Sequence, residues 1–249
     1  METRVLTLYK NLGETPLECI ERFRLDNPEF KEIKMTYLGR LDPMAEGMLL
    51  VLAGDTAEKE IYLSMDKTYE FEVLWGFSTD TYDILGLVTE GEGKMPEKIE
   101  ERMPSLLDTL RDKKIQSYPP YSSKTVDGKP LFQWAREKRI EEIDVPERSI
   151  KIFSIDHMDT RLVSKSELLK EIIERINLVK GDFRQEEIIN TWSSVLQNTR
   201  EEHFLISKFK ASVSSGTYIR GLAHEMGKYW GEGALAFCIK RTRVGEYIL

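Results

Sequence analysis

The chain has 249 residues, 41% of them hydrophobic and 32% charged, which is typical of a globular protein and excludes low-complexity and collagen-like chains. No apolar run approaches the roughly 20 residues that span a bilayer, and the N-terminal residues hold no apolar signal core, so we expect a cytoplasmic protein without a membrane partner. Cys19 and Cys238 form no CxxC pair and are expected to be free thiols. The net charge of −7 argues against binding nucleic acid with the whole surface, but it leaves room for a local basic face.

The first elements follow local rules. Residues 4–10 predict a short strand, and residues 11–13 supply a turn. Thr15 is expected to cap the helix that follows, with Pro16 at its first position and Glu18 placed to complete a capping box.

Two strands with different patterns come next. Residues 47–54, GMLLVLAG, have the continuous apolar character of a strand that is covered on both faces. Residues 67–75 alternate, with Tyr69, Phe71, Val73 and Trp75 on one side, which predicts a strand with one buried face. The polar residues 79–83, TDTYD, are interpreted first as a structural Asx-type turn.

The rest of the chain mixes helices and strands. Helices are expected within residues 96–112 and 129–139, on either side of an extended segment that tandem prolines impose at 118–123. Residues 148–160 predict a strand, and Ser164 to Gln197 predict a charged, peripheral helical segment whose role the sequence leaves open.

A strand, a Ser-Ser-Gly turn and a helix are expected in residues 203–231, and a final strand in 234–249. Because these elements do not follow a regular βαβ spacing, the sequence predicts an α+β fold. Residues 208–249 hold seven Lys and Arg residues against three Glu residues, a weak indication of an anionic ligand in an acidic protein.

Several kinds of chemistry lack their sequence patterns. There is no GxxxxGK[ST] or GxGxxG loop, no HExxH and no GxSxG elbow, so we expect neither a metal nor another cofactor. Chemistry would then depend on Asp, Tyr, Arg and Lys side chains. Asp42 is the notable acid, since it lies between Leu41 and Pro43 just before a buried strand. Its position alone allows a turn residue, a helix cap, a metal ligand or a nucleophile.

Four segments resemble the TruB family of tRNA pseudouridine synthases, in the order that the family has them. They are GRLDPMAEGMLLVLAGDTAEK, KTYEFEVLWGFSTDTYDILGLV, QSYPPYSSKTVDGKPLFQWAR and SSGTYIRGLAHEMGKYWGEGALAFCIKRTRVGEY, which together cover most of the chain. The resemblance implies the pseudouridine synthase fold, a twisted, mostly antiparallel mixed sheet flanked by helices with a central RNA-binding cleft.

The resemblance also implies three catalytic residues. Asp42 would be the nucleophile, Arg220 would pair with its carboxylate and orient it, and Tyr69 would stack on the extruded uracil and is a candidate to take the C5 proton. Without the resemblance, Asp42 would be interpreted as a turn residue, Tyr69 as sheet packing and Arg220 as a helix-surface residue.

Five further residues match positions that bind substrate. Tyr218 and Ile239 would line the base pocket, and Lys67 would lie near the active site. Tyr37 and Arg40 depart from the family's usual GHTGTLDP. Tyr37 replaces a histidine and can stack but carries no charge near neutral pH; Arg40 makes the turn similar to that of sister synthases that modify ribosomal RNA.

The resemblance implies isomerisation of uridine to pseudouridine, most simply uridine 55 in the TΨC stem-loop of tRNA, after base flipping. Bacterial relatives usually continue into a C-terminal RNA-binding PUA domain that this sequence lacks, so we expect residues 1–249 to be a single catalytic domain. We also expect a monomer that needs no protein partner. Two alternatives stay open: a synthase acting on ribosomal or another RNA, and an RNA-binding or tRNA-folding protein with little catalysis.

Overall fold

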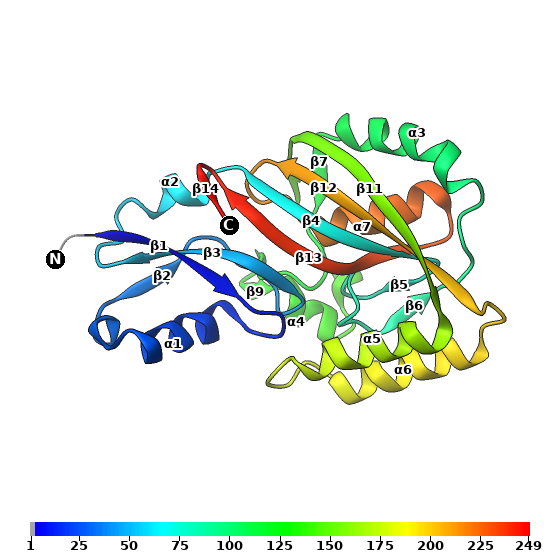
Figure 1. Ribbon diagram of the computed structural model, residues 1–249, viewed down its shortest axis with the longest axis horizontal. Helices are drawn as coiled ribbons and strands as arrows, with labels where there is room; N and C mark the ends of the chain where they lie inside the picture. The colour runs from blue at the N-terminus through cyan, green and yellow to red at the C-terminus, as the bar shows by residue number, and fades with distance from the viewer. Residues whose placement is uncertain (1–2) are drawn as a thin grey trace.

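One large twisted sheet organises residues 3–249, the part of the chain that the computed structural model describes (Figure 1). Six strands follow the order β1-β3-β13-β4-β12-β11, and β2 and β14 pair with β3 and β13. All neighbours are antiparallel except β3 and β13, which are parallel. The strands are β1 (Arg4–Lys10), β2 (Met35–Tyr37), β3 (Ala45–Ala53), β4 (Lys67–Trp75), β11 (Ile152–Ser164), β12 (His203–Val213), β13 (Ala234–Val244) and β14 (Tyr247–Ile248). The predicted α+β class and mostly antiparallel mixed sheet are confirmed.

Helices cover both faces of this sheet (Figure 1). Side chains of α3 and α7 pack in one hydrophobic cluster with β4 and β12, while those of α5 and α6 pack in a second cluster against the other face. Three short strand pairs lie outside the large sheet, namely β5 (Ser78–Thr79) with β6 (Val88–Glu90), β7 (Ile115–Ser117) with β10 (Glu147–Ser149), and β8 (Thr125–Val126) with β9 (Lys129–Pro130). The helices are α1 (Pro16–Asp26), α2 (Lys59–Leu63), α3 (Ile99–Arg111), α4 (Leu131–Arg136), α5 (Lys165–Asn177), α6 (Gln185–Asn198) and α7 (Ile219–Trp230).

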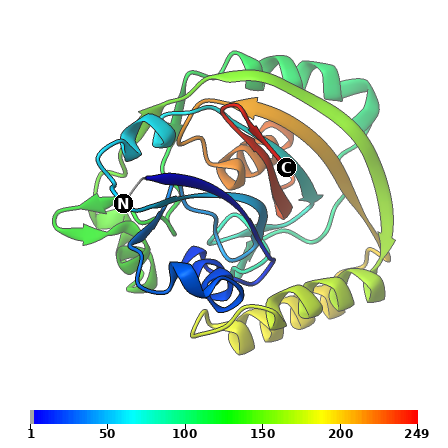
Figure 2. The ribbon, with the colours of Figure 1, turned by 60° about the vertical axis from the view of Figure 1, so that its left-hand side comes forward.

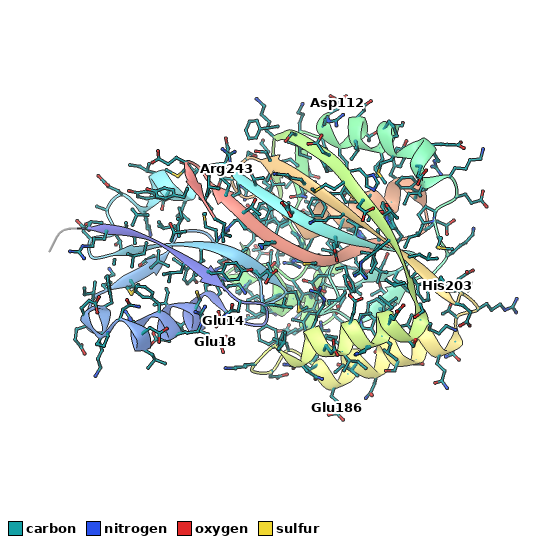
Figure 3. The ribbon with its side chains drawn as sticks, viewed as in Figure 1. Glu14, Glu18, Asp112, Glu186, His203 and Arg243 are labelled. Atoms are coloured by element: carbon teal, nitrogen blue, oxygen red, sulfur yellow. The ribbon has the colours of Figure 1, made fainter. Side chains whose placement is uncertain are left out.

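Helix α1 begins as the sequence predicts. Thr15 Oγ1 accepts a hydrogen bond from the Glu18 amide at 3.2 Å, and the Glu18 carboxylate accepts one from the Thr15 amide at 2.7 Å. These reciprocal bonds satisfy two of the amides that the first turn of a helix leaves without partners. Glu14 lies close to Glu18 at this end of the helix (Figure 3) and forms an ion pair with Arg22.

Strand β4 differs from its prediction in one respect. Its Tyr69-to-Trp75 face packs against α3 and α7, as expected, and Glu70 and Glu72 on the other face are partly exposed. Leu74, on the same face as the glutamates, is fully buried in the cluster with α5 and α6. The one-face expectation is therefore wrong at the end of the strand, because α5 and α6 cover that part of the second face.

The predicted helical segment of residues 164–197 is a hairpin of two helices, α5 and α6, inserted between the paired strands β11 and β12 (Figure 2). Ser164 forms a second capping box, with Glu167, and Gly181 has a φ of +81°, which glycine adopts readily, in the connecting turn. The apolar stripes of both helices face the sheet, which leaves the charged faces outside. The peripheral helical expectation is confirmed, although a continuous helical pattern concealed the turn.

None of the helices in residues 3–249 has the length and hydrophobicity needed to cross a membrane. The single-domain interpretation stays a prediction.

Candidate active site

A cleft of about 660 Å³ opens beside the turn that leads into β3. Its walls come from this turn, from the start of β4, from residues 81–85, 121–136 and 183–184, and from the segment that enters α7. The cleft brings together seven of the eight predicted site residues: Arg40, Asp42, Lys67, Tyr69, Tyr218, Arg220 and Ile239. Tyr37 is the exception, because it lies in β2 beside the hydrophobic cluster of α1 and is not among the cleft residues.

Asp42 and Arg220 form an ion pair in this cleft. Arg220 Nε donates to Asp42 Oδ2 at 2.8 Å. The Arg220 side chain is 4% exposed, whereas that of Asp42 is 42% exposed. The pairing therefore fixes one oxygen of a carboxylate that still faces the cleft, which is the geometry that a nucleophile needs.

Arg220 is held by backbone as well as by carboxylates. It belongs to the first turn of α7, and its two terminal nitrogens donate to the carbonyl oxygens of Thr81 and Tyr121. Each of the three guanidinium nitrogens donates to a different segment of the chain. These hydrogen bonds together fix the position of the planar guanidinium.

Asp83 is a second carboxylate at this arginine, and the sequence interpretation missed it. Its Oδ2 lies 3.6 Å from Arg220 Nε, and its Oδ1 accepts from Thr81 Oγ1 at 2.7 Å and from the Leu85 amide at 3.0 Å. Burial raises the pKa of Asp83 to about 6, although the charge of Arg220 acts in the opposite direction. The predicted Asx-type turn begins at Asp83, whose carboxylate accepts from the Leu85 amide, while within residues 79–83 the Asp83 amide donates to Thr81 Oγ1. The interpretation of these acids as structural is incomplete, because Asp83 also supports the site.

Aromatic and aliphatic side chains form the apolar part of the cleft. Tyr69 on β4 is 8% exposed and Ile239 on β13 is 5% exposed. The half-buried Tyr218 packs edge-to-face on Tyr118, with ring centroids 5.7 Å apart. A flat, mostly apolar group with polar edges, such as a nucleobase, suits these walls.

The far wall contains Tyr121 and Arg184, which the sequence analysis did not name as site residues and which Asp80 supports from outside the cleft. Arg184, in the turn between α5 and α6, donates to Asp80 at 2.8 Å, and its guanidinium lies 4.7 Å from the centroid of the Tyr121 ring. Burial raises the pKa of Tyr121 to about 12, and the charge of Asp80 adds to this. The helical hairpin thus contributes to the cleft through its tip.

Within residues 3–249 no three His, Cys, Asp or Glu side chains are grouped as a metal site requires.

Comparisons with known proteins address the fold and the family of the chain. The fold is similar to that in a solved Cbf5–Nop10–Gar1 complex, with a TM-score of 0.57 and 19% identity over 98% of this chain and 49% of that chain. A Nop10–Cbf5 complex of an archaeal box H/ACA sRNP gives a TM-score of 0.52 and 18% identity over 98% of this chain and 48% of that chain. At these identities the likeness concerns the fold alone.

The family model "TruB family pseudouridylate synthase (N terminal domain)" matches residues 28–182. The chain belongs to the TruB family of pseudouridylate synthases. The predicted family and the predicted class of enzyme are confirmed.

Curated relatives match nearly the whole chain. The tRNA pseudouridine synthase B of Aquifex aeolicus is 28% identical over 97% of this chain and 68% of its own length. The enzyme of the same name from Bacillus licheniformis is 31% identical over 100% of this chain and 67% of its own. The Thermosipho melanesiensis enzyme is 30% identical over 97% and 64%. The chain therefore spans about two thirds of the length of these relatives.

Proposed function

We propose that this enzyme isomerises uridine 55 in the TΨC loop of tRNA, with Asp42 as the nucleophile. The conversion of uridine to pseudouridine in tRNA is the activity that its TruB membership and its relatives named tRNA pseudouridine synthase B support. The observation that carries the role of Asp42 is its pairing, on one oxygen only, with a buried arginine inside the cleft.

The reaction moves one bond and one proton. Asp42 attacks C1′ as the N1–C1′ glycosidic bond breaks, and the uracil then turns. A C5–C1′ bond forms as the Asp42–C1′ bond breaks, the C5 proton leaves, and N1 takes up a proton. Substrate and product have the same atoms, so no co-substrate is required. In this proposal Tyr69, which lines the cleft, stacks on the uracil and accepts the C5 proton, and Arg220, which donates to Asp42, keeps its carboxylate aimed.

The target base must leave the RNA stack before it can reach Asp42. Base flipping costs a few kcal/mol of unstacking, which contacts in the pocket offset. Tyr69 and Tyr218 supply aromatic surfaces for this, and Ile239 supplies an aliphatic wall. The partner in this proposal is the folded tRNA stem-loop, bound in the cytoplasm by a monomeric single-domain enzyme. Neither a cofactor nor a protein partner has a role in it.

A different RNA target is the second candidate. Arg40 is exposed at the rim of the cleft, where it could contact RNA, and its GRLD turn is similar to that of synthases acting on ribosomal RNA. A binding protein without catalysis is a weaker alternative, since binding alone needs no Asp42–Arg220 pair.

Tritium release from tRNA transcripts that carry uracil-5-³H tests these proposals. We expect release by the wild-type protein, no release by Asp42→Asn, and none from a transcript with cytidine at position 55. Release from the transcript with cytidine at position 55 would show that another uridine of the RNA is the target. Release by Asp42→Asn at the wild-type rate would remove Asp42 from its proposed role.

A further inference from the structure

Three cationic side chains gather around two turns at the edge of the cleft: Lys67 and Arg241 line the cleft with Asp42, and Arg148 lies against the Ser215–Gly216 turn. Arg241 donates to the carbonyl oxygen of Gly39, three residues before Asp42, and Lys67 Cε lies 4.0 Å from the position that a Cβ on Gly39 would take. Lys67 Nζ also donates to Ser215 Oγ at 3.2 Å, and Arg148 donates to the carbonyl oxygen of the same serine at 3.0 Å. We call Lys67, Arg148 and Arg241 the cation cluster.

The cation cluster contains no ion pair. Within residues 3–249 none of its members has a carboxylate oxygen within 4.0 Å, whereas Arg184 and Arg220 in the same cleft are each paired with an aspartate. Arg241 donates instead to the carbonyl oxygens of Met48, Arg40 and Gly39, and Lys67 to those of Leu63 and Met65. Lys67 and Arg241 therefore have hydrogen-bond partners for their nitrogens, but the three positive charges of the cluster are not balanced.

This arrangement is costly for folding. Lys67 is 4% exposed and Arg241 is 1% exposed, and buried charges in proteins are ordinarily paired. Burial, together with the charges of Arg241 and Arg148, lowers the pKa of Lys67 to about 8. Arg148 Nε is buried and has no hydrogen-bond partner among the described residues. The chain has 43 Asp and Glu residues, yet none of those that the structure describes is paired with this cluster. An anion supplied by a ligand would explain why these buried charges lack an acidic partner there.

The backbone beside the cluster makes room for the Arg148 side chain. Gly216 has a φ of +78° and lines the cleft, and a Cβ there would fall 1.9 Å from a terminal nitrogen of Arg148. Only glycine therefore lets the Arg148 guanidinium lie against this turn. The exposed side chain of Arg40 lies at the rim of the same part of the cleft, without an ion pair in the described residues.

We propose that the cation cluster is the subsite for one phosphodiester of the RNA strand, the one directly 5′ or 3′ of the target nucleotide. The inference rests on the proposed function, because an RNA substrate that brings its base to Asp42 must bring a phosphate within one nucleotide of it. Cations that lack acidic partners provide the attraction on which phosphate contacts depend. The phosphate would then supply the negative charge that the protein omits.

The test measures binding alone, in an Asp42→Asn background that prevents turnover. The ligand is a TΨC stem-loop oligonucleotide, either unmodified or with one uncharged methylphosphonate on the 5′ or 3′ side of the target. Lys67→Met and Arg148→Gln each remove one charge of the cluster. We expect each to reduce the slope of log K against log[salt] by about 0.7, the value for one phosphate contact on a single strand.

The decisive measurement combines a substitution in the protein with the methylphosphonate in the RNA. The methylphosphonate at one of the two positions should weaken binding by the Asp42→Asn parent about tenfold, while Lys67→Met should bind the modified and unmodified RNA equally. A full methylphosphonate effect in both Lys67→Met and Arg148→Gln would overturn the proposal.

Lys10→Met is the matched control. Lys10 is also buried, also donates to backbone carbonyls and also has a pKa lowered to about 8 by burial, but it neither lines the cleft nor bonds to Ser215, the residue that Lys67 and Arg148 share. We expect it to keep the parent's salt slope and methylphosphonate effect. If Lys67→Met does not fold, the salt slope and the methylphosphonate effect are measured with Arg148→Gln instead. Failure of the proposed isomerisation would appear in tritium release by the enzyme with Asp42 intact, independently of these binding measurements.

Discussion

Asp42 and Asp83 share the guanidinium of Arg220, whose Nε lies 2.8 Å from Oδ2 of the first and 3.6 Å from Oδ2 of the second. The two carboxylates have different surroundings, because Asp83 is buried and the side chain of Asp42 is 42% exposed. One carboxylate is therefore available to a substrate, while the other supports the arginine from within the protein.

Replacing Arg220 should impair both folding and catalysis. Arg220→Ala leaves Asp83 buried without its countercharge, so we expect a loss of about 3–5 kcal/mol in the free energy of unfolding. Arg220→Lys keeps a charge but cannot bond Asp42, Thr81 and Tyr121 together, so it should fold better and still lose most of the activity. Urea unfolding and tritium release measure the two effects. Equal stability of Arg220→Ala and wild type would contradict the assigned role.

Asp83→Asn should reduce catalysis, and it should also remove a pH-dependent decrease in the free energy of unfolding. Because the pKa of Asp83 is raised from 3.8 to about 6 on folding, the folded state binds its proton more tightly, and stability falls as the pH rises from about 4 through 6. The asparagine variant should lose this dependence, so its stability relative to wild type should rise from pH 4 to pH 7, as measured by urea unfolding; an unchanged difference would contradict this role of Asp83.

The catalytic effect of Asp83→Asn should appear in kcat rather than KM, since Asp83 acts through Arg220. We expect a decrease of about 10²-fold in kcat, the usual effect of a small misplacement of a reacting group. A change confined to KM would instead place Asp83 in contact with the RNA.

His224 should make the stability of the protein depend on pH in the direction opposite to that of Asp83. Its ring stacks on Tyr82 with centroids 3.8 Å apart, and burial lowers its pKa from 6.5 to about 4. The unfolded chain then binds more protons between these values, so this residue's contribution to stability is present above pH 6.5 and is lost as the pH falls toward 4. His224→Gln should reduce that loss, as measured by urea unfolding at pH 7, 5.5 and 4.5. An unchanged loss would show that His224 is not its source.

Arg184→Ala should weaken substrate binding more than chemistry. The change removes the ion pair with Asp80 and the contact with the Tyr121 ring, which together hold one wall of the cleft. We expect KM to rise about tenfold, equivalent to about 1.4 kcal/mol, with a smaller change in kcat. Lys170→Ala, which removes only an exposed pair with Glu174 on α5, should leave both parameters unchanged.

The features that the sequence predicted well depend on short stretches of chain. The capping box of Thr15 and Glu18 involves four consecutive residues, and the continuous apolar pattern of β3 shows directly that both faces are covered. Asp42 and Arg220 could be named because each lies inside a segment that resembles the family's motifs, although their pairing joins residues 178 positions apart.

What the sequence missed depends on contacts between distant segments. Asp83 has the sequence of a turn residue, and only the approach of α7 makes it a buried carboxylate beside Arg220. Arg184 lies within an uninterrupted helical pattern, 104 positions from its partner Asp80. Leu74 is buried because the α5–α6 hairpin, itself an insertion between two strands, folds back over it. None of these relations leaves a periodic signal in the chain.

The place of β13 in the sheet affects how the protein can be synthesised. Among the described strands, the β1–β3 pair and the β4–β12–β11 group form no hydrogen-bonded pair with each other, and β13, which follows all of them in the sequence, joins them. It also brings Ile239 and Arg241 to the cleft. A nascent chain still attached at the ribosome therefore exposes two unpaired strand edges, on β3 and β4, until residues 234–244 emerge. The cleft can close only after translation of β13, so aggregation during synthesis is the hazard that this topology carries.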